Sequence, residues 1–337
     1  MADPIAMYGD FTPREAGKAW KQLEKRAVPM MVTERFAQTR PMQKNQTKVM
    51  IFRRVEKIDP ATTPLMEGVS PEGSKPTYTD IQAVIQQYGD FIPFTDQLED
   101  FNTDNIISEF GDVLSEQIQE TIEVLNIAVL KSGTTVYYAG NVANRGLVAD
   151  FTTVGQFKKV ERFLRDQKAK LYTKILAGSP RYGTTPVPAS FVALCDTDLK
   201  ADFEALPGWK SVETYAEPAQ RLHEYEIGSV GSVRVIASPM FDAWPDAGAA
   251  AATKIGTTNP AAACDVYPIL VLGMDAWATI PMRNGSTGHP VMVSTKPSKS
   301  DPIGQRGSIG WKIYHCAVIL NDNFMARIEV AAVLNPA

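Results

Sequence analysis

Cysteine is scarce in this sequence. The 337 residues include three cysteines, Cys195, Cys264 and Cys316, which lie far apart and form no Cys-x-x-Cys pair. This odd number at such spacing argues against a disulfide framework and against a zinc site, because both need grouped cysteines. We therefore expect three reduced thiols that behave mostly as small buried apolar residues.

Long apolar runs are also missing. No run approaches the roughly 20 residues that a bilayer-spanning helix needs. The opening Met-Ala-Asp-Pro-Ile lacks the basic and apolar regions of a signal peptide. We expect a protein that is made and folded in the cytoplasm and has no membrane partner.

A strong charge of one sign is absent as well. The formal net charge of −4 argues against a dedicated nucleic-acid binder. The charge is unevenly distributed, because residues 1–57 carry twelve Lys and Arg against six Asp and Glu. A basic arm on an acidic body is suited to docking on a neighbouring copy. The alternative, given equal weight, is a solvated basic helix face formed by Lys18, Lys21, Lys25 and Arg26.

The remaining composition is that of an ordinary globular chain, with 44% hydrophobic and 21% charged residues. A chain of this length buries a substantial core and exceeds one typical domain. We therefore expect either two subdomains or one elaborated α/β domain.

The N-terminal part predicts an arm followed by a two-stranded excursion. Prolines interrupt any long element in residues 1–46, which favours an extended arm. Residues 47–57 and 78–95 have strand patterns, and prolines and glycines break up residues 59–76 between them. An isolated two-stranded ribbon is marginal in water, so we expect it to lean on another subunit.

Two helices are predicted next. Residues 105–131 carry apolar side chains at intervals of three or four, and Gly133 is placed to end the helix. At 1.5 Å per residue such a helix spans roughly 40 Å, so it is a candidate spine. A second helix is expected to begin at the capping box of Thr153 and Gln156 and to reach about Leu171.

The second half of the chain predicts short elements of an α+β subdomain. We expect a buried strand at 190–195, a helix at 198–206 and a strand at 233–237. The alanine-rich residues 243–263 have the low complexity of an exposed insertion.

Strand patterns return near the C-terminus, at 267–274 and 278–282. A Gly-rich loop over 301–310 then leads into a predicted closing β-hairpin. Trp311, Ile313, His315, Ala317 and Ile319 alternate on one face of it, and Asn321-Asp322-Asn323 supplies its turn.

A near-match to a phosphate-binding loop lies between Gly68 and Lys75. Its order is reversed, because the lysine must precede the hydroxyl residue, here Ser74, to reach the phosphates. Pro71 also removes one N–H from the cradle. We therefore interpret these residues as the turn-rich tip of the two-stranded excursion and predict no cofactor-binding residues.

Cys195 is a candidate cysteine nucleophile, with Asp196 beside it and His223 or His315 as the possible base. No local signature surrounds Cys195, and the pattern places it on a buried strand. Asp196 is better explained as the N-cap of the helix that follows. We predict no catalytic residues and no enzyme activity.

Metal binding is not predicted either. Asp196 and Asp198 offer too few oxygens for a calcium loop. His315 and Cys316 are adjacent on a strand, so their side chains point to opposite faces and cannot reach one ion. We expect His315 to be a buried, hydrogen-bonded histidine.

Several sequence blocks occur in an order that resembles the major capsid proteins of tailed bacteriophages, in the subgroup related to N4-like podophages. The blocks are residues 48–54, 62–71, 87–90 with 95–96, 226–228 with 231–236, and 301–307, and they cover the chain from about 45 to 332. The Asp-Pro-Ile-Gly-Gln-Arg-Gly block that begins at Asp301 is the most specific of them.

The resemblance implies the capsid fold that tailed phages share with herpesviruses. Its parts would be an N-terminal arm at 1–46, an extended loop at 47–95, a peripheral domain at 96–187 with the spine helix 105–131, an axial domain at 188–265, and return strands at 266–337 that complete the peripheral domain.

The same resemblance implies a function of geometric assembly. The chain would be a virion subunit that assembles with itself, in the host bacterial cytoplasm, into hexamers and pentamers of an icosahedral head around double-stranded DNA. Scaffolding, portal and decoration proteins are implied as further partners, with the packaged DNA contacted non-specifically. Some relatives cross-link an extended-loop lysine to an asparagine; Lys57 and Lys75 are available here, but the sequence gives no warrant for the reaction.

Two alternatives stay open at this point. An encapsulin-like nanocompartment shell would use the same fold to enclose a protein cargo. A soluble hydrolase using Cys195 belongs to a different class of protein and is the remote alternative.

Overall fold

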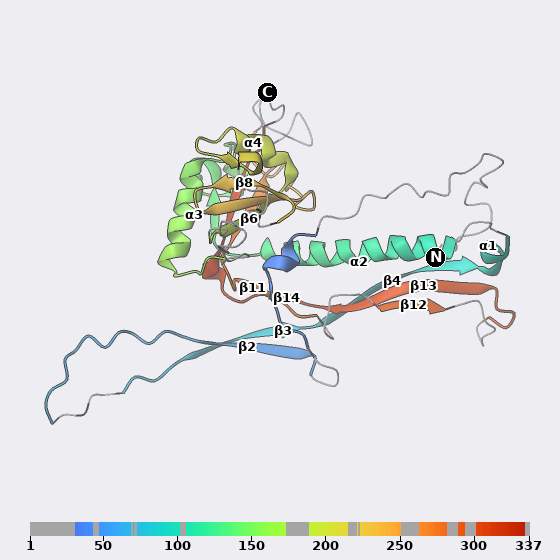
Figure 1. The fold of residues 1–337 in the computed structure, drawn as a ribbon, viewed down its shortest axis with the longest axis horizontal. Coiled ribbons are helices and arrows are strands. Elements are labelled where there is room, and N and C mark those ends of the chain that lie inside the picture. The colour runs from blue at the N-terminus through green and yellow to red at the C-terminus, as the bar shows by residue number, and fades with distance from the viewer. Residues whose placement is uncertain are drawn as a thin grey trace, which may run out of the picture.

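The computed structural model describes residues 31–42, 47–68, 70, 73–101, 106–172, 189–214, 221, 223–250, 263–281, 289–293 and 301–333. Residues 1–30 and 43–46 of the predicted arm therefore lie outside the described residues. Most of the predicted insertion at 243–263 lies outside them as well. Figure 1 shows two parts, a sheet domain and a long extension that continues into a ribbon.

A seven-stranded mixed sheet forms the centre of the sheet domain. Its strands, in spatial order, are β5 (Val136–Tyr138), β15 (Met325–Val330), β10 (Tyr267–Leu272), β6 (Phe191–Cys195), β9 (Val233–Ala237), β8 (Glu226–Val230) and β7 (Lys210–Ser211). The pairs β5/β15 and β6/β9 are parallel, and the other neighbours are antiparallel. The predicted buried strands at 190–195 and 233–237 are confirmed.

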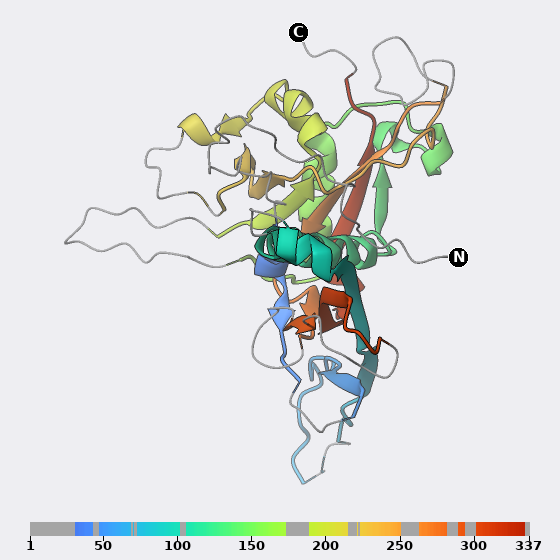
Figure 2. The same cartoon turned by 90° about the vertical axis from the view of Figure 1, so that its right-hand side faces the viewer.

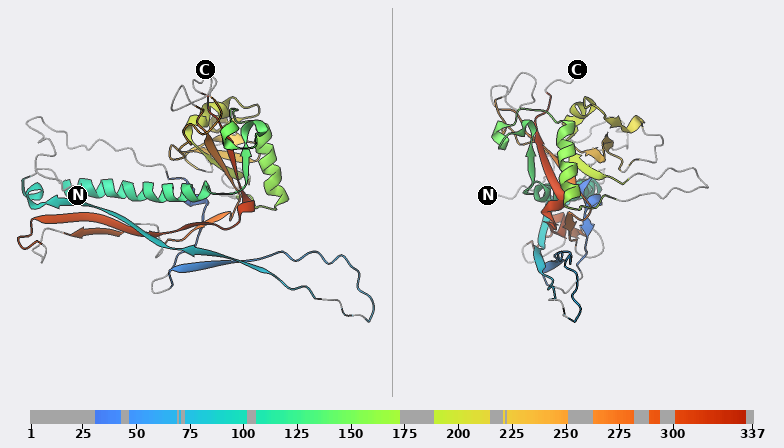
Figure 3. Two further views of the ribbon diagram at one scale, coloured as in Figure 1. Left: turned by 180° about the vertical axis from the view of Figure 1, so that it is seen from behind. Right: turned by 90° about the vertical axis from the view of Figure 1, so that its left-hand side faces the viewer.

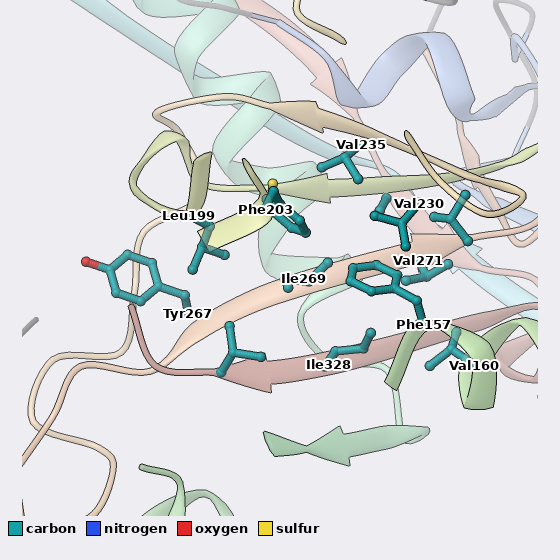
Figure 4. Packing of buried hydrophobic residues seen from close by; sticks show 14 of the residues in the cluster. Phe157, Val160, Leu199, Phe203, Val230, Val235, Tyr267, Ile269, Val271 and Ile328 are labelled. Carbon is teal, nitrogen blue, oxygen red and sulfur yellow. The ribbon is translucent and has the colours of Figure 1, made fainter. Parts of the chain in front are cut away.

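Both faces of this sheet are covered, which explains why its middle strands are buried at every residue. On one face, α3 (Val154–Asp166) and α4 (Lys200–Glu204) pack over the strands. Figure 4 shows Phe157 of α3 and Phe203 of α4 in one cluster with Ile269 and Ile328 of the sheet. The other face packs against the C-terminal end of a long helix and a short 3-10 helix, η1 (Thr33–Phe36).

The long helix is α2 (Ile106–Leu130), which confirms the predicted spine within one residue at each end. It lies along a three-stranded antiparallel sheet in the order β12 (His289–Val293), β13 (Arg306–His315) and β4 (Gln86–Thr95). A short helix, α1 (Asp96–Phe101), follows β4. Apolar residues of α2 and of this sheet form one cluster, which includes Leu114, Ile122, Phe94 and Trp311.

The ribbon consists of β2 (Val49–Val55) and β3 (Tyr78–Val84), paired antiparallel over seven residues each. Figures 1 and 3 show it extending away from the body, on the side opposite to the N-terminal end of α2. A small sheet of β1 (Gln38–Thr39), β11 (Trp277–Thr279) and β14 (Ala317–Ile319) lies where the ribbon leaves the body. Figure 2 shows the ribbon and the sheet domain at opposite ends of the molecule.

The prediction of one strand over residues 78–95 is wrong. The chain forms β3 and β4, which meet at Ile85 and pair with different partners, β2 and β13. Ile85 is 3% exposed and its N–H donates to the carbonyl of Lys48. Alternating residues are compatible with an unbroken extended chain, so the local pattern does not reveal where the pairing partner changes.

The predicted closing hairpin is also wrong. β13 pairs with β4 and β12, whereas β15 joins the seven-stranded sheet beside β10 and β5. The turn chemistry itself is confirmed, because the side chain of Asn321 accepts from the N–H of Asn323 at the start of η7 (Asp322–Phe324). This turn carries the chain from one sheet to another instead of folding it back on itself.

Smaller differences concern element ends. The capping box of Thr153 and Gln156 is confirmed at the start of α3, but the helix ends at Asp166 and not near Leu171, and Lys168 has a left-handed φ of 59° just beyond it. The helix predicted at 198–206 is divided into η4 (Thr197–Leu199) and α4. The described residues also form the 3-10 turns η2 (Ala139–Asn141), η3 (Arg145–Leu147) and η5 (Val212–Thr214).

Residues 243–250 do not behave as a simple exposed insertion. Trp244 is half-buried and forms a bridge to Val266 through two backbone hydrogen bonds. Among the described residues, no helix is both long and apolar enough to cross a membrane.

Candidate assembly surfaces

One face of the ribbon is exposed and largely apolar. Side chains alternate along a strand, and the β2/β3 register places Val49 opposite Val84, and Val55 opposite Tyr78. Ile51 lies between them and is 54% exposed, while Val55 and Tyr78 are exposed to about the same degree. The ribbon therefore presents an apolar face that the chain itself does not bury, which is the usual mark of an interaction surface.

An ion pair interrupts this apolar face. The guanidinium of Arg53 donates from Nε and Nη2 to the two carboxylate oxygens of Asp80, at 2.8 and 2.9 Å. This contact lowers the pKa of the Asp80 carboxyl and also places the guanidinium 5.6 Å from the ring centre of Tyr78. Because the pair is bidentate and directly opposite across the strands, it favours the observed register.

The opposite face of the ribbon is anchored to the body near its base. Met50 and Phe52 pack with Ala83 against a cluster that includes Met42 and Ile280. Further out, the carboxylate of Glu56 accepts from Arg54 and from the hydroxyl of Thr79. The two faces thus differ: one is held by the chain, and the other is available to a second molecule.

The irregular end of the ribbon carries its most exposed apolar side chains among the described residues. Leu65 and Met66 are each 76% exposed. Gly68, in the predicted near-match to a phosphate-binding loop, has a left-handed φ of 78° and turns the chain here. The interpretation of this segment as the ribbon tip is confirmed, although Pro71 lies outside the described residues.

A buried polar junction holds the arm onto the spine helix. The carboxylate of Glu123, on α2, is fully buried. It accepts from the backbone N–H groups of Val32 and Thr33, each at 3.0 Å, and from the hydroxyl of Thr33 at 2.5 Å. Burial raises the pKa of Glu123, and these hydrogen bonds oppose that increase.

Asn126, one turn further along α2, extends this junction to the sheet. Its Nδ2 donates to the hydroxyl of Thr33 at 3.1 Å, and its Oδ1 lies 2.9 Å from Nε2 of His315 on β13. Since Oδ1 is an acceptor, Nε2 of His315 carries the proton. Burial lowers the pKa of His315 to about 4, so the ring stays neutral near pH 7. The prediction of a buried, hydrogen-bonded histidine is confirmed.

A second buried cluster holds the end of α2 onto the central sheet. Glu329 is fully buried and accepts from Arg145, at 2.7 and 2.8 Å, and from Arg327 at 2.8 Å. Arg327 also donates to the carbonyl of Gly133 at 3.2 Å and to that of Lys131. The carbonyls at a helix C-terminus lack intrahelical partners, so this arginine caps α2 from the sheet.

The ring of Trp244 packs against Arg145, one of the two arginines that bind Glu329. The guanidinium of Arg145 lies 3.7 Å from the ring centre of Trp244, a distance typical of a cation–π contact. Because the cluster joins α2, η3 and β15, it sets the direction in which the long helix leaves the sheet domain.

The structure does not bring together the residues considered as a catalytic group. Cys195 is fully buried in β6, where burial strongly raises the pKa of its thiol. His315 bonds to Asn126, and the ring of His223 lies 6.2 Å from that of Phe36. A buried thiol with a raised pKa is the opposite of an activated nucleophile. Asp196 accepts from the N–H of Asp198, which confirms the predicted N-cap.

Sequence reasoning missed Thr33, Glu123 and Asn126. Glu123 and Asn126 lie outside the apolar stripe of α2, where a polar residue normally faces solvent. Their roles depend on a segment that precedes them by about 90 residues. The sequence carries no local signal for such a contact.

Comparison with known proteins gives one family. A family model described as phage capsid protein matches residues 78–328. The major capsid protein of Pseudomonas phage KPP21 is 24% identical over 277 residues, which cover 75% of this chain and 68% of that relative.

Solved structures share the fold over nearly the whole chain. The capsid of Ralstonia phage GP4 has a TM-score of 0.68 at 11% identity, covering 97% of this chain and 98% of that one. The capsid structure of Cyanophage P-SCSP1u has a TM-score of 0.60 at 13% identity, covering 95% and 94%. The fold-level prediction is therefore confirmed, with matches at identities too low to carry more than the fold.

Proposed function

Because this chain belongs to the phage capsid protein family, we propose a specific way in which its copies build a shell. The chain is a phage major capsid protein, a structural component of the virion that associates with itself into capsomers, and it is not an enzyme. The nanocompartment shell and the cysteine hydrolase, which the sequence left open, are set aside in favour of this family.

The proposal is that each subunit lays the apolar face of its ribbon on a neighbouring copy. The observation that carries it is the exposure of Ile51, Val55 and Tyr78 on a ribbon whose two strands, within the described part of the chain, pair with each other alone. A two-stranded ribbon gains little stability by itself, and its edges invite pairing. A second copy supplies both the apolar cover and the support.

Repeating one such contact around an axis generates a ring, since the donor and acceptor surfaces differ. We propose that the rings are hexamers and pentamers that close into an icosahedral head around double-stranded DNA. The rigid clusters at Glu123 and Glu329 support this assignment, because they fix how the spine and the sheet domain are joined while the ribbon extends freely. Scaffolding, portal and decoration proteins remain proposed partners, and contact with DNA is proposed to be non-specific.

The domain assignment is likewise a proposal. The predicted parts are the arm at 1–46, the extended loop at 47–95, the peripheral domain at 96–187, the axial domain at 188–265 and the return strands at 266–337. The layout supports an extended loop that ends near β4 and a peripheral domain built around α2. Membership of the N4-like subgroup rests on the order of the sequence blocks and is proposed on that ground.

The test compares two substitutions of equally exposed apolar residues. Ile51→Glu places a charge on the ribbon face, and Leu147→Glu, at 53% exposure on the sheet domain, is the matched control. Negative-stain electron microscopy and light-scattering mass are measured for the wild type and both variants, together with circular dichroism of each subunit. We expect the wild type and the control to form capsomers or shells, and I51E to stay folded but unassembled.

Assembly of I51E at the wild-type level would contradict the ribbon contact. If the wild type itself stays monomeric, the scaffolding protein is added before the comparison is repeated. A failure of all three proteins to assemble with scaffold present would contradict the proposed self-assembly.

A further inference from the structure

The sheet that lies along α2 has two outer edges, formed by β4 on one side and β12 on the other. Within the described part of the chain, neither edge pairs with a further strand. An edge strand with free N–H and C=O groups is a template for pairing with another chain. In a protein that associates with itself, such an edge offers a contact between copies that competes with the correct one.

The register of β4 with β13 shows which backbone groups lie at the free edge. Opposite residues of an antiparallel pair alternate between hydrogen-bonded and non-hydrogen-bonded pairs. Pro93 lies opposite Ser308 and has no N–H to donate to β13, which places this pair among the non-hydrogen-bonded ones. By the alternation, the N–H and C=O groups of Phe91 and Gly89 also point to the free edge. The close approach of Phe91 to Gly310 agrees with this, since non-hydrogen-bonded pairs are the narrower ones.

Two successive edge positions of β4 lack a free donor. Pro93 has no N–H at all. The N–H of Phe91 donates to Oδ1 of Asp90, the residue before it, at 2.8 Å. Asp90 and Phe91 are both exposed, so this contact lies where a further strand would have to bind. A strand that approaches β4 here meets one missing donor, one donor already in use and a negative charge.

The spine helix holds the Asp90 carboxylate in this position. Nε2 of Gln117, on α2, donates to Oδ2 of Asp90 at 2.8 Å. Oε1 of Gln117 accepts from Nε1 of the buried Trp311 at 2.9 Å. Because the indole N–H can only donate, it fixes which end of the Gln117 amide faces Asp90. A continuous series of hydrogen bonds therefore runs from Trp311 through Gln117 and Asp90 to the N–H of Phe91.

The other edge of the sheet also has a proline at an outward position. Trp311 lies opposite Asp90 in β4 and opposite Pro290 in β12. The pair with Asp90 is of the hydrogen-bonded kind, so the backbone groups of Trp311 are used on the β4 side. The position of the absent N–H of Pro290 is then the free edge of β12. In contrast, the ribbon strands β2 and β3 contain no proline.

We propose that both edges of this sheet are closed to strand pairing, so that copies of the subunit cannot associate through them. Asp90 determines this specificity at the β4 edge, and Gln117 is its positioning residue. Pro93 and Pro290 remove a donor from each edge. Copies are thereby directed to contacts through other surfaces. The inference concerns a contact that assembly excludes, and it holds whether or not the proposed ribbon contact is correct.

The first test opens the β4 edge with the variant D90A/P93V. It frees the N–H of Phe91 and adds an N–H at position 93. One net backbone hydrogen bond shifts an equilibrium about fivefold, so the two donors are expected to strengthen edge pairing about 25-fold. Light-scattering mass is measured below the concentration at which the wild type assembles. Hydrogen-exchange mass spectrometry follows the peptide 86–95, whose amides are expected to become protected as the variant associates.

The matched control is D96A. Oδ1 of Asp96 accepts the N–H of Gln97 at 2.8 Å, which is the same contact at the start of α1 and not at a strand edge. We expect D96A to associate like the wild type. Circular dichroism and urea unfolding establish that each variant is folded.

A folded D90A/P93V that associates no more than D96A would overturn the proposal, and so would association without protection of the peptide 86–95. If D90A/P93V does not fold, P93V decides in the same way. That variant keeps the Asp90 carboxylate and adds one donor, so its edge pairing is expected to strengthen about fivefold.

A second series tests the positioning role of Gln117. Q117E still accepts from Trp311 but repels the Asp90 carboxylate, so the amide of Phe91 is expected to exchange faster. In D90N/Q117E the new amide at position 90 donates to the new carboxylate at 117 and again accepts from Phe91. Hydrogen exchange resolved to single residues is expected to return to the wild-type rate. Fast exchange at Phe91 in D90N/Q117E, at unchanged stability, would contradict the positioning role.

Discussion

Single buried polar residues decide how the elements of this subunit meet. Glu123 accepts hydrogen bonds from three donor groups of the arm, and Glu329 accepts from two arginines. A buried charge is costly unless it is paired or hydrogen-bonded, so each of these sites tolerates few alternative arrangements. Each carboxylate connects its own element, α2 for Glu123 and β15 for Glu329, to residues of another element.

At Glu123, the substitution Glu123→Gln is expected to destabilise the subunit by about 1–3 kcal/mol, because the side-chain amide turns a donor toward the donors of Val32 and Thr33. Urea unfolding measures the effect. The control is Glu204→Gln, at an exposed pair with Lys200, where we expect a change within about 0.5 kcal/mol. Equal changes in the free energy of unfolding for Glu123→Gln and Glu204→Gln would mean that the junction at Glu123 does not stabilise the subunit.

His315 makes stability depend on pH. Its pKa is lowered to about 4 in the folded chain from 6.5 in the unfolded chain, so the unfolded chain binds more protons between these values. The free energy of unfolding is therefore expected to rise with pH through this window and to be lost as the pH falls from 6.5 to 4, by up to about 3 kcal/mol.

The measurement compares the wild type with His315→Gln, which keeps an N–H for Asn126 but cannot titrate. Urea midpoints between pH 4 and 7 are expected to differ in slope, and the difference isolates His315 from Glu123, whose raised pKa acts in the opposite direction. Parallel pH profiles would contradict the assignment.

At the level of elements, the close pairing of β4 and β13 depends on glycine. A Cβ added to Gly310 would lie 2.6 Å from Cβ of Phe91 and 2.8 Å from the carbonyl oxygen of Asp90. Gly310 therefore lets the backbone of β4 at Asp90 and Phe91 approach β13 closely, and the same ladder holds the sheet that supports α2.

Gly310→Ala is expected to destabilise the subunit by about 1–3 kcal/mol, because the backbone of β4 cannot move aside without breaking ladder bonds. The control is Gly155→Ala in the first turn of α3, where the nearest contact is Thr153 Oγ1 at 3.8 Å. There we expect stabilisation of about 0.5–1 kcal/mol, since alanine is the better helix former. The measurement is the thermal unfolding temperature of both variants. An unchanged unfolding temperature for G310A would contradict the prediction that β4 and β13 cannot accommodate a Cβ at this position.

At the level of the whole molecule, the described end of the predicted arm is part of the subunit core. Residues 32–42 belong to the core of the subunit, since Val32 and Phe36 pack on α2 and the central sheet and Met42 packs under the ribbon. The fold therefore needs at least this described part of the predicted arm at 1–46.

Two truncations test this. Deleting residues 1–30 keeps Val32 and Thr33 as donors to Glu123, so we expect the free energy of unfolding to change by less than about 1 kcal/mol. Deleting residues 1–42 leaves Glu123 buried without its donors and opens the core, so we expect a loss of at least about 3 kcal/mol or failure to fold. Circular dichroism and urea unfolding of both truncations measure this, and equal stability would contradict the assignment of residues 32–42 to the core.

The sequence by itself determined the local elements and the class of protein. Periodicity was enough for α2, β6 and β9, and the reciprocal hydrogen bonds of Thr153 and Gln156 were enough for the start of α3, because these signals lie within a few residues of each other. The ordered blocks from 48–54 to 301–307 were enough for the family.

The tertiary structure alone decided which strands pair and which polar residues become buried. Nothing in the alternation of residues 78–95 indicates that the chain changes sheets at Ile85, and nothing near Asn321 indicates that β13 and β15 belong to different sheets. Glu123 looks like a surface carboxylate until the arm, some 90 residues earlier in the chain, donates to it. Register and burial depend on partners that are distant in sequence, and a local pattern carries no information about them.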